Sequence, residues 1–72
     1  MKGSELIRLL RKVGRRRGVT VELVPERGKG SHGILYFGGR FTVMRSLKDE
    51  LKTGTLHAML KQLGLTLDDL KD

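Results

Sequence analysis

His32 is the residue of this sequence whose type and setting best suit chemistry near neutral pH. It lies in the segment RGKGSHG at positions 27–33. An imidazole with a pKa near 6.5 can take a proton from a ribose 2′-hydroxyl or return one to a leaving oxygen, which speeds such a step by about 10² to 10⁴. The setting therefore allows RNA cleavage by internal attack of the 2′-oxygen. It equally allows a histidine that merely contacts solvent or a phosphate.

The glycine-rich segment before this histidine can bring a phosphate close to the backbone. Gly28 and Gly30 have no Cβ, so backbone N–H groups can approach a phosphate there. Arg27 and Lys29 add positive charge, and the backbone of Gly30 and Ser31 would hold the phosphate. An ordinary flexible surface loop is the alternative interpretation.

Two named glycine motifs do not fit this segment. The letters GKGSHG match G-x-G-x-x-G, but that fingerprint needs a strand before it and a helix after it, whereas a strand follows here. The G-x-x-G of the KH module joins two helices and fails for the same reason. With no cysteine and two histidines, a zinc site lacks its four donors. We expect neither metal nor cofactor.

The remaining candidates for chemistry or binding are weaker. His57 flanks the apolar stripe of a predicted helix, and most such histidines are boundary residues. Tyr36 and Phe37 can stack on bases, as aromatic residues of RNA-binding sheets do. A place in the core is the alternative, above all for Phe37 and Phe41.

Positive charge is the main compositional signal. The 72 residues carry 15 Lys and Arg against 8 Asp and Glu, a net charge of +7, and residues 1–45 hold 11 of the basic and 3 of the acidic side chains. This distribution favours a polyanion such as nucleic acid, because each neutralised phosphate releases counterions. General solubility is the alternative. The arginines expected to contact RNA outside the glycine-rich segment are Arg8, Arg11, Arg15, Arg16 and Arg17.

Two amphipathic helices are expected to support these residues. Apolar residues recur at helical spacing over 4–13, with Ser4 as the cap and Gly14 as the stop. Thr53 would cap a second helix that Gly64 ends. Its buried stripe would consist of Leu56, Met59, Leu60 and Leu63.

Three strands are expected between the helices. Residues 19–24 alternate as a half-buried strand that Pro25 ends, and residues 32–37 and 40–44 flank Gly38-Gly39, which suits a tight hairpin turn. Alternation places Leu35 and Phe37 on one face of that hairpin. The tail 65–72 would add one short helical turn, docked through Leu65, Leu67 and Leu70, with its acids exposed.

The order helix, three strands, helix predicts an α+β fold. The expected architecture is a single domain over 1–72, with both helices on one face of a three-stranded antiparallel sheet and the other face open. Glu5 interrupts the apolar segment that a signal peptide would need, and no apolar run approaches the roughly 20 residues of a membrane span. We expect a cytoplasmic protein that does not bind a membrane.

Three segments, in this order, resemble one known family. SELIRLLRKVG at the start, GKGSH in the middle and ELKTGTLHAMLKQLGL near the end are similar to the HicA-type mRNA interferase toxins of bacterial toxin-antitoxin systems. The resemblance spans nearly the whole chain. It implies an αβββα fold like that of double-stranded RNA-binding domains, which agrees with the element order above.

The resemblance also implies a function and partners. It implies a translation-blocking endoribonuclease that cleaves mRNA without a metal, a stress-response toxin whose active histidine corresponds to His32. It further implies a HicB-type antitoxin that covers the active site, with operator DNA bound only through the toxin-antitoxin complex. The alternative is a non-catalytic RNA-binding module of the same fold, and a DNA-binding fragment is a third, weaker hypothesis.

Overall fold

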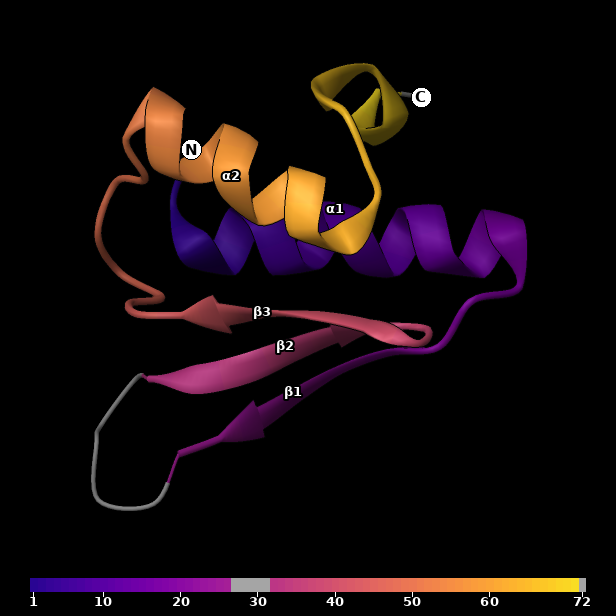
Figure 1. Ribbon diagram of the computed structural model, residues 1–72, viewed down its shortest axis with the longest axis horizontal. Coiled ribbons are helices and arrows are strands. Elements are labelled where there is room, and N and C mark those ends of the chain that lie inside the picture. Colours follow the sequence, from indigo (N-terminus) through magenta and orange to yellow (C-terminus); the bar gives the residue numbers. More distant parts are fainter. Residues whose placement is uncertain (27–31, 72) are drawn as a thin grey trace.

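Two helices cover one face of a three-stranded sheet, in the order that the sequence predicts. The computed structural model describes residues 1–26 and 32–71. Helix α1 (Gly3–Arg17) is followed by strands β1 (Val21–Pro25), β2 (Gly33–Phe37) and β3 (Arg40–Met44), helix α2 (Thr53–Leu63) and a 3-10 helix, η1 (Leu67–Leu70). Both long helices lie on the same side of the sheet (Figure 1), and η1 packs against α1. The predicted α+β class and αβββα order are confirmed.

The sheet is antiparallel with the strands in chain order, β1-β2-β3. Its central rows are Leu23–Leu35–Thr42 and, on the opposite face, Glu22–Tyr36–Phe41. Gly38, with φ of 61°, opens the two-residue turn between β2 and β3, and glycine adopts this left-handed conformation without steric cost.

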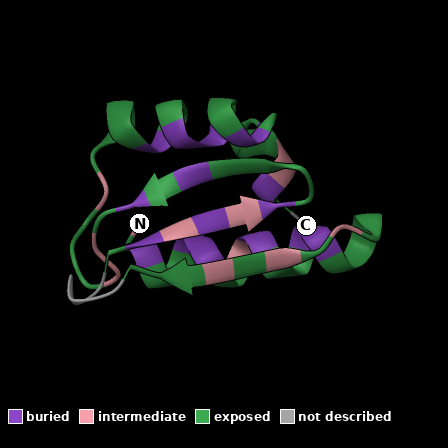
Figure 2. Cartoon of the chain, turned by 60° about the horizontal axis from the view of Figure 1, so that its bottom comes forward, coloured by how far each residue is buried: buried purple, intermediate pink, exposed green. Residues whose placement is uncertain are grey.

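The core lies between the sheet and the helices, where one face of α1, α2, β2 and β3 is buried, while one face of β1 is half-buried (Figure 2). Leu35 and Phe37 face it from β2, as predicted, and the predicted stripe of α2 is buried in full. The fully buried large side chains of the core are Leu6, Leu10, Val13, Leu35, Met44, Leu60 and Leu63. None of the helices in the described part of the chain is long and apolar enough to cross a membrane.

Helix α1 is longer than predicted, because Gly14 does not stop it. The helix continues to Arg17 and ends at Gly18, which has φ of 69°. A Cβ on Gly14 would lie 2.6 Å from the Val19 carbonyl oxygen and 2.7 Å from Val21 Cγ2. The glycine is therefore required by the close return of the chain beneath the helix, which a sequence pattern does not reveal.

The predicted helix caps were also wrong. Lys2 and Lys52 precede the two helices, and neither helix has a side-chain cap, so Ser4 and Thr53 lie inside the first turns. The Ser4 backbone N–H instead donates to the Leu47 carbonyl at 3.0 Å. The connection before α2 thus satisfies a donor that a cap would otherwise serve.

The bounds of one strand and the exposure of two apolar side chains differ from the expectation. Strand β1 begins at Val21 rather than at 19 and includes Pro25. Phe41 is 57% exposed, because its register places it on the open face of the sheet and not in the core. Leu67 is 38% exposed, so the tail docks through Leu65 and Leu70.

Candidate active site

His32 lies at the entrance to β2, where the sheet begins. It is exposed, and its carbonyl accepts a hydrogen bond from the Glu26 N–H at 2.9 Å. Gly33, the next residue, is buried, and a Cβ there would lie 2.8 Å from the Val24 carbonyl oxygen. The close approach of β1 therefore fixes the backbone beside the histidine while the residue itself stays open to solvent.

The strand register adds two charged residues to this site. β1 pairs Pro25 with Gly33, and β3 pairs Met44 with Gly33. One step further along each strand, Glu26 and Arg45 occupy the positions on either side of the histidine, and both are exposed. The sequence analysis missed both residues. Counting outward from the Gly38-Gly39 turn would have found Arg45, because the turn alone sets that register.

The glycine-rich part of the predicted site lies outside the described residues. This applies to Arg27, Lys29, Gly30 and Ser31. Their assignment to phosphate binding remains a prediction from the sequence.

The predicted arginines of α1 divide into two groups. Arg8, Arg11 and Arg15 are exposed and, with Lys12, line a shallow hollow on one side of the helix, with Ile7 at its base. These residues recur every three or four positions and so form one continuous basic stripe along the helix. Such a stripe can follow the phosphates of a polyanion.

The second group, Arg16 and Arg17, binds the C-terminal tail. Arg16 Nη2 donates to the carbonyls of Asp69 and Lys71, both at 3.3 Å, and Arg17 Nη2 forms a 2.6 Å ion pair with Asp69 Oδ1. The Arg17 hydrogen bond and the Thr66 N–H hold the pKa of Asp69 below its usual 3.8. The expectation that the tail acids are simply exposed was therefore wrong for Asp69. Arg16 and Arg17 therefore hold the tail against α1.

The two predicted binding regions lie at opposite ends of the sheet. The C-terminal end of α1 sits beside the β2–β3 turn, because the Val19 N–H donates to the Gly14 carbonyl and the Gly38 N–H donates to the Thr20 carbonyl. Strand β2 starts at the other end (Figure 1). The arginines of 15–17, which the sequence predicts to contact RNA, therefore lie at the opposite end of the sheet from His32.

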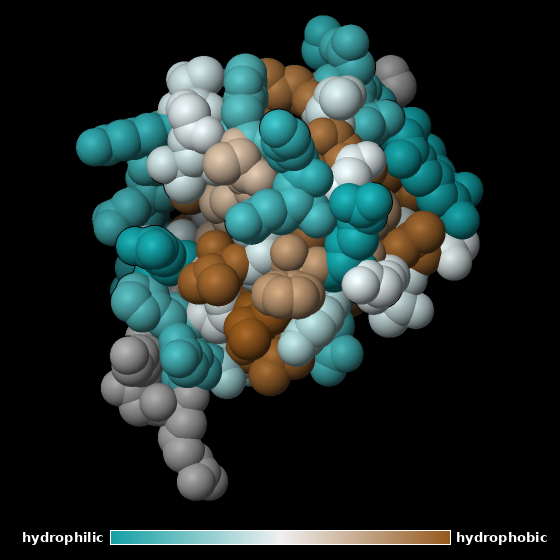
Figure 3. Space-filling view, in the orientation of Figure 1, coloured by the Kyte–Doolittle hydropathy of each residue, from teal (hydrophilic) through white to brown (hydrophobic). Residues whose placement is uncertain are grey.

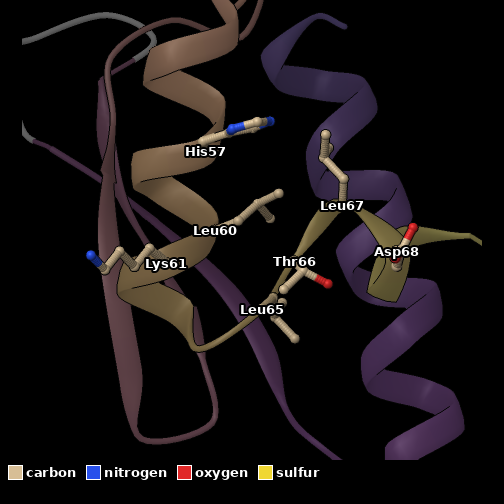
Figure 4. Close-up of a pocket in the computed structure, with 7 residues that line it drawn as sticks. All are labelled: His57, Leu60, Lys61, Leu65, Thr66, Leu67 and Asp68. Carbon is tan, nitrogen blue, oxygen red and sulfur yellow. The ribbon is translucent and has the colours of Figure 1, made fainter.

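The second histidine, His57, lines a hollow of about 420 Å³ between α2 and η1. Figure 4 shows its ring extending toward Leu67, while Lys61 points away from that side. His57 is exposed and lies on the helical layer, not at the strand end that carries His32. It keeps the boundary position that the sequence predicts.

Comparison with known proteins gives one match. A family model described as "HicA toxin of bacterial toxin-antitoxin" matches residues 3–65. No curated protein and no solved structure matches. The matched part runs from the start of α1 to just beyond α2 and leaves η1 outside. A match over so much of the chain shows that this protein belongs to the HicA toxin family of bacterial toxin-antitoxin systems, a membership that indicates an antitoxin partner.

Proposed function

We propose that this toxin is an endoribonuclease that cleaves mRNA in the cytoplasm and thereby blocks translation, with His32 as a proton-transfer residue. The observation that carries the proposal is the exposed histidine at a rigid strand entrance in a chain of the HicA family. A base removes the proton of a ribose 2′-hydroxyl, the 2′-oxygen attacks the adjacent phosphorus, and the bond to the 5′-oxygen breaks as that oxygen gains a proton. This reaction has its nucleophile within the RNA and requires no metal.

Such a reaction uses two proton-transfer groups and concentrates negative charge on the phosphate. His32 supplies one group. Glu26 and Arg45, at the flanking register positions, are the described residues best placed to provide the second group and to stabilise the charge. This adds two named residues to the site.

RNA binding is assigned to two basic surfaces. One is the glycine-rich segment with Arg27, Lys29, Gly30 and Ser31, and the other is the stripe of Arg8, Arg11 and Arg15 along α1. Arg16 and Arg17 are excluded because they hold the tail. The partner is a HicB-type antitoxin that covers the site, and the complex of the two proteins binds operator DNA.

Replacing His32 with alanine tests the catalytic assignment. We expect RNA cleavage to fall by about 10² to 10⁴ and growth arrest to disappear, with the melting temperature unchanged because the side chain is exposed. His57→Ala is the matched control, since it removes an exposed histidine elsewhere and should leave cleavage intact.

The same variants separate the enzyme from the alternative RNA-binding module. A folded His32→Ala protein that still cleaves RNA and arrests growth would exclude the enzymatic role of His32. Loss of cleavage with unchanged RNA affinity would exclude the non-catalytic module.

A further inference from the structure

The outer edge of β3 has backbone groups that no other strand uses. The Gly38 N–H donates to Thr20 and the His32 carbonyl accepts from Glu26, so the even-numbered residues along β2 turn toward β1. Because antiparallel strands alternate, the odd-numbered residues of β2 turn toward β3 and bond to Arg40, Thr42 and Met44. Phe41 and Val43 therefore direct their N–H and C=O groups outward, where the sheet order β1-β2-β3 places no further strand among the described residues.

The two edges of the sheet differ in how they are protected. By the same alternation, β1 turns Pro25 outward, and proline has no N–H to offer a neighbouring strand. Glu26 adds a charge at that end. Proline and charged residues are the usual means of blocking strand addition. β3 has neither between its end residues: Phe41 is 57% and Val43 is 48% exposed, and hydrophobic side chains reach the surface at the level of the strands in Figure 3.

A trough runs beside this unprotected edge. Two hollows of about 390 and 380 Å³ lie between β3 and α2, and Thr42, Val43 and Gln62 line both. Thr42 is buried and its hydroxyl bonds to the Gln62 side chain, which fixes the wall between the hollows. An added strand would pair with the backbone of β3 and place alternate side chains in this trough, as peptides do when they extend a sheet.

The charges at the trough favour an acidic occupant. Arg40 lines one hollow and Arg45 the other, at the two ends of β3. A second copy of this chain would bring its own Arg40 and Arg45 to the same edge, where like charges disfavour pairing. A net charge of +7 on each chain adds to this repulsion. A segment with acidic residues at both ends is complementary instead.

We propose that the antitoxin binds this toxin by adding an extended segment with acidic ends to the outer edge of β3. The inference rests on the proposed function, which supplies the antitoxin partner. The added strand would lie two strand spacings, about 10 Å, from β2. The antitoxin would therefore be anchored beside His32, with one acidic end of its anchor strand at Arg45 and no part of that strand on His32.

Val43→Pro tests the anchor without disturbing the sheet. Val43 makes no ladder bond to β2, so proline there removes an outward N–H only. Val43→Thr is the matched control, because it keeps the N–H and the branched shape. The probe is a purified HicB-type antitoxin protein. We expect the Kd to rise about tenfold or more for Val43→Pro, and to change less than about threefold for Val43→Thr.

The melting temperature and RNA cleavage of free Val43→Pro, both expected to match the wild type, check that the variant is folded. Amide hydrogen exchange gives a second measurement on the wild type. In the complex, Phe41 and Val43 should gain protection while Val21 and Leu23, on the other edge, should not.

The outcomes separate the inference from the proposed function. Equal binding by wild type and Val43→Pro, or a complex without added protection at Phe41 and Val43, overturns the β3 anchor alone. Protection of these amides in the toxin by itself at high concentration assigns the edge to a second copy and also overturns it. Failure of the wild type to bind the HicB-type protein removes the partner from the proposed function, and the anchor with it.

Discussion

The two ends of the sheet use their charged side chains differently. At the end where β2 begins, Glu26, His32 and Arg45 are exposed and take part in none of the ion pairs within residues 1–26 and 32–71. At the other end, Arg16 and Arg17 bind the tail through Asp69 and the carbonyl of Lys71. The charged groups at the first end are therefore open to solvent, whereas those at the second hold the tail against α1. The net charge of the chain does not distinguish charged side chains that are open to solvent from those that hold the fold together.

The largest expected effect on stability comes from a substitution where the chain returns beneath α1. Gly14→Ala places a Cβ against the Val19 carbonyl and Val21, and backbone cannot move aside as a flexible side chain can. We expect a loss of about 2 kcal/mol and a melting temperature lower by about 10 °C. Gly54→Ala is the control, because a Cβ there has nothing within 4 Å and gains about 0.5 to 1 kcal/mol of helix propensity. Calorimetry that finds both variants equally stable would contradict the close return of the chain beneath α1.

A smaller effect distinguishes the two groups of arginines. Arg11→Gln should lower the slope of log RNA affinity against log salt by about 0.7 to 0.9, because one phosphate contact is lost. Arg17→Gln should leave that slope unchanged and lower the melting temperature, because Arg17 holds Asp69. Fluorescence titrations across a salt series measure the first, and thermal unfolding the second. A slope that falls for Arg17→Gln would return this residue to the RNA surface.

The smallest expected effect is the pH response of the tail. Since Arg17 holds the pKa of Asp69 below its usual 3.8, the ionised carboxylate favours the folded state above about pH 4, and this contribution is lost as pH falls through the lower folded-state value. Leu70 methyl signals should therefore show loosening of η1 under acid conditions. Asp69→Asn should show the same loosening at pH 7. The neighbouring Asp68→Asn is the control, since Asp68 pairs only with the exposed Lys71 among the described residues; an equal effect from both would argue against the Arg17 contact.

Periodicity and turn chemistry predicted most of what positions the site. The alternation of β2, the turn at Gly38-Gly39 and the end of α2 at Gly64 are local properties, and each was correctly predicted. The position of His32 at a strand entrance followed from them. These features depend on neighbours within a few residues, which a single sequence displays.

The errors concern contacts between distant residues. Gly14 is a residue type that often ends a helix, but this helix continues past it. The missing Cβ leaves room for the chain that returns at Val19. Phe41 is a large apolar residue of the type usually found in a core, but the strand register places it on the open face of the sheet. Asp69 meets Arg17 across 52 positions, and no spacing rule connects them. Glu26 likewise joins His32 only once β1 pairs with β2, whereas the position of Arg45 follows from the Gly38-Gly39 turn.

The tail contact also sets an order of assembly. The three strands are consecutive and joined by short connections, so the sheet closes small loops, whereas η1 must reach back to the first helix across nearly the whole chain. During synthesis η1 also leaves the ribosome after the three strands. The sheet, with His32 at one end and the free edge of β3 along its side, can therefore pair its strands before the opposite end is closed, so an antitoxin could meet its docking edge on a nascent toxin.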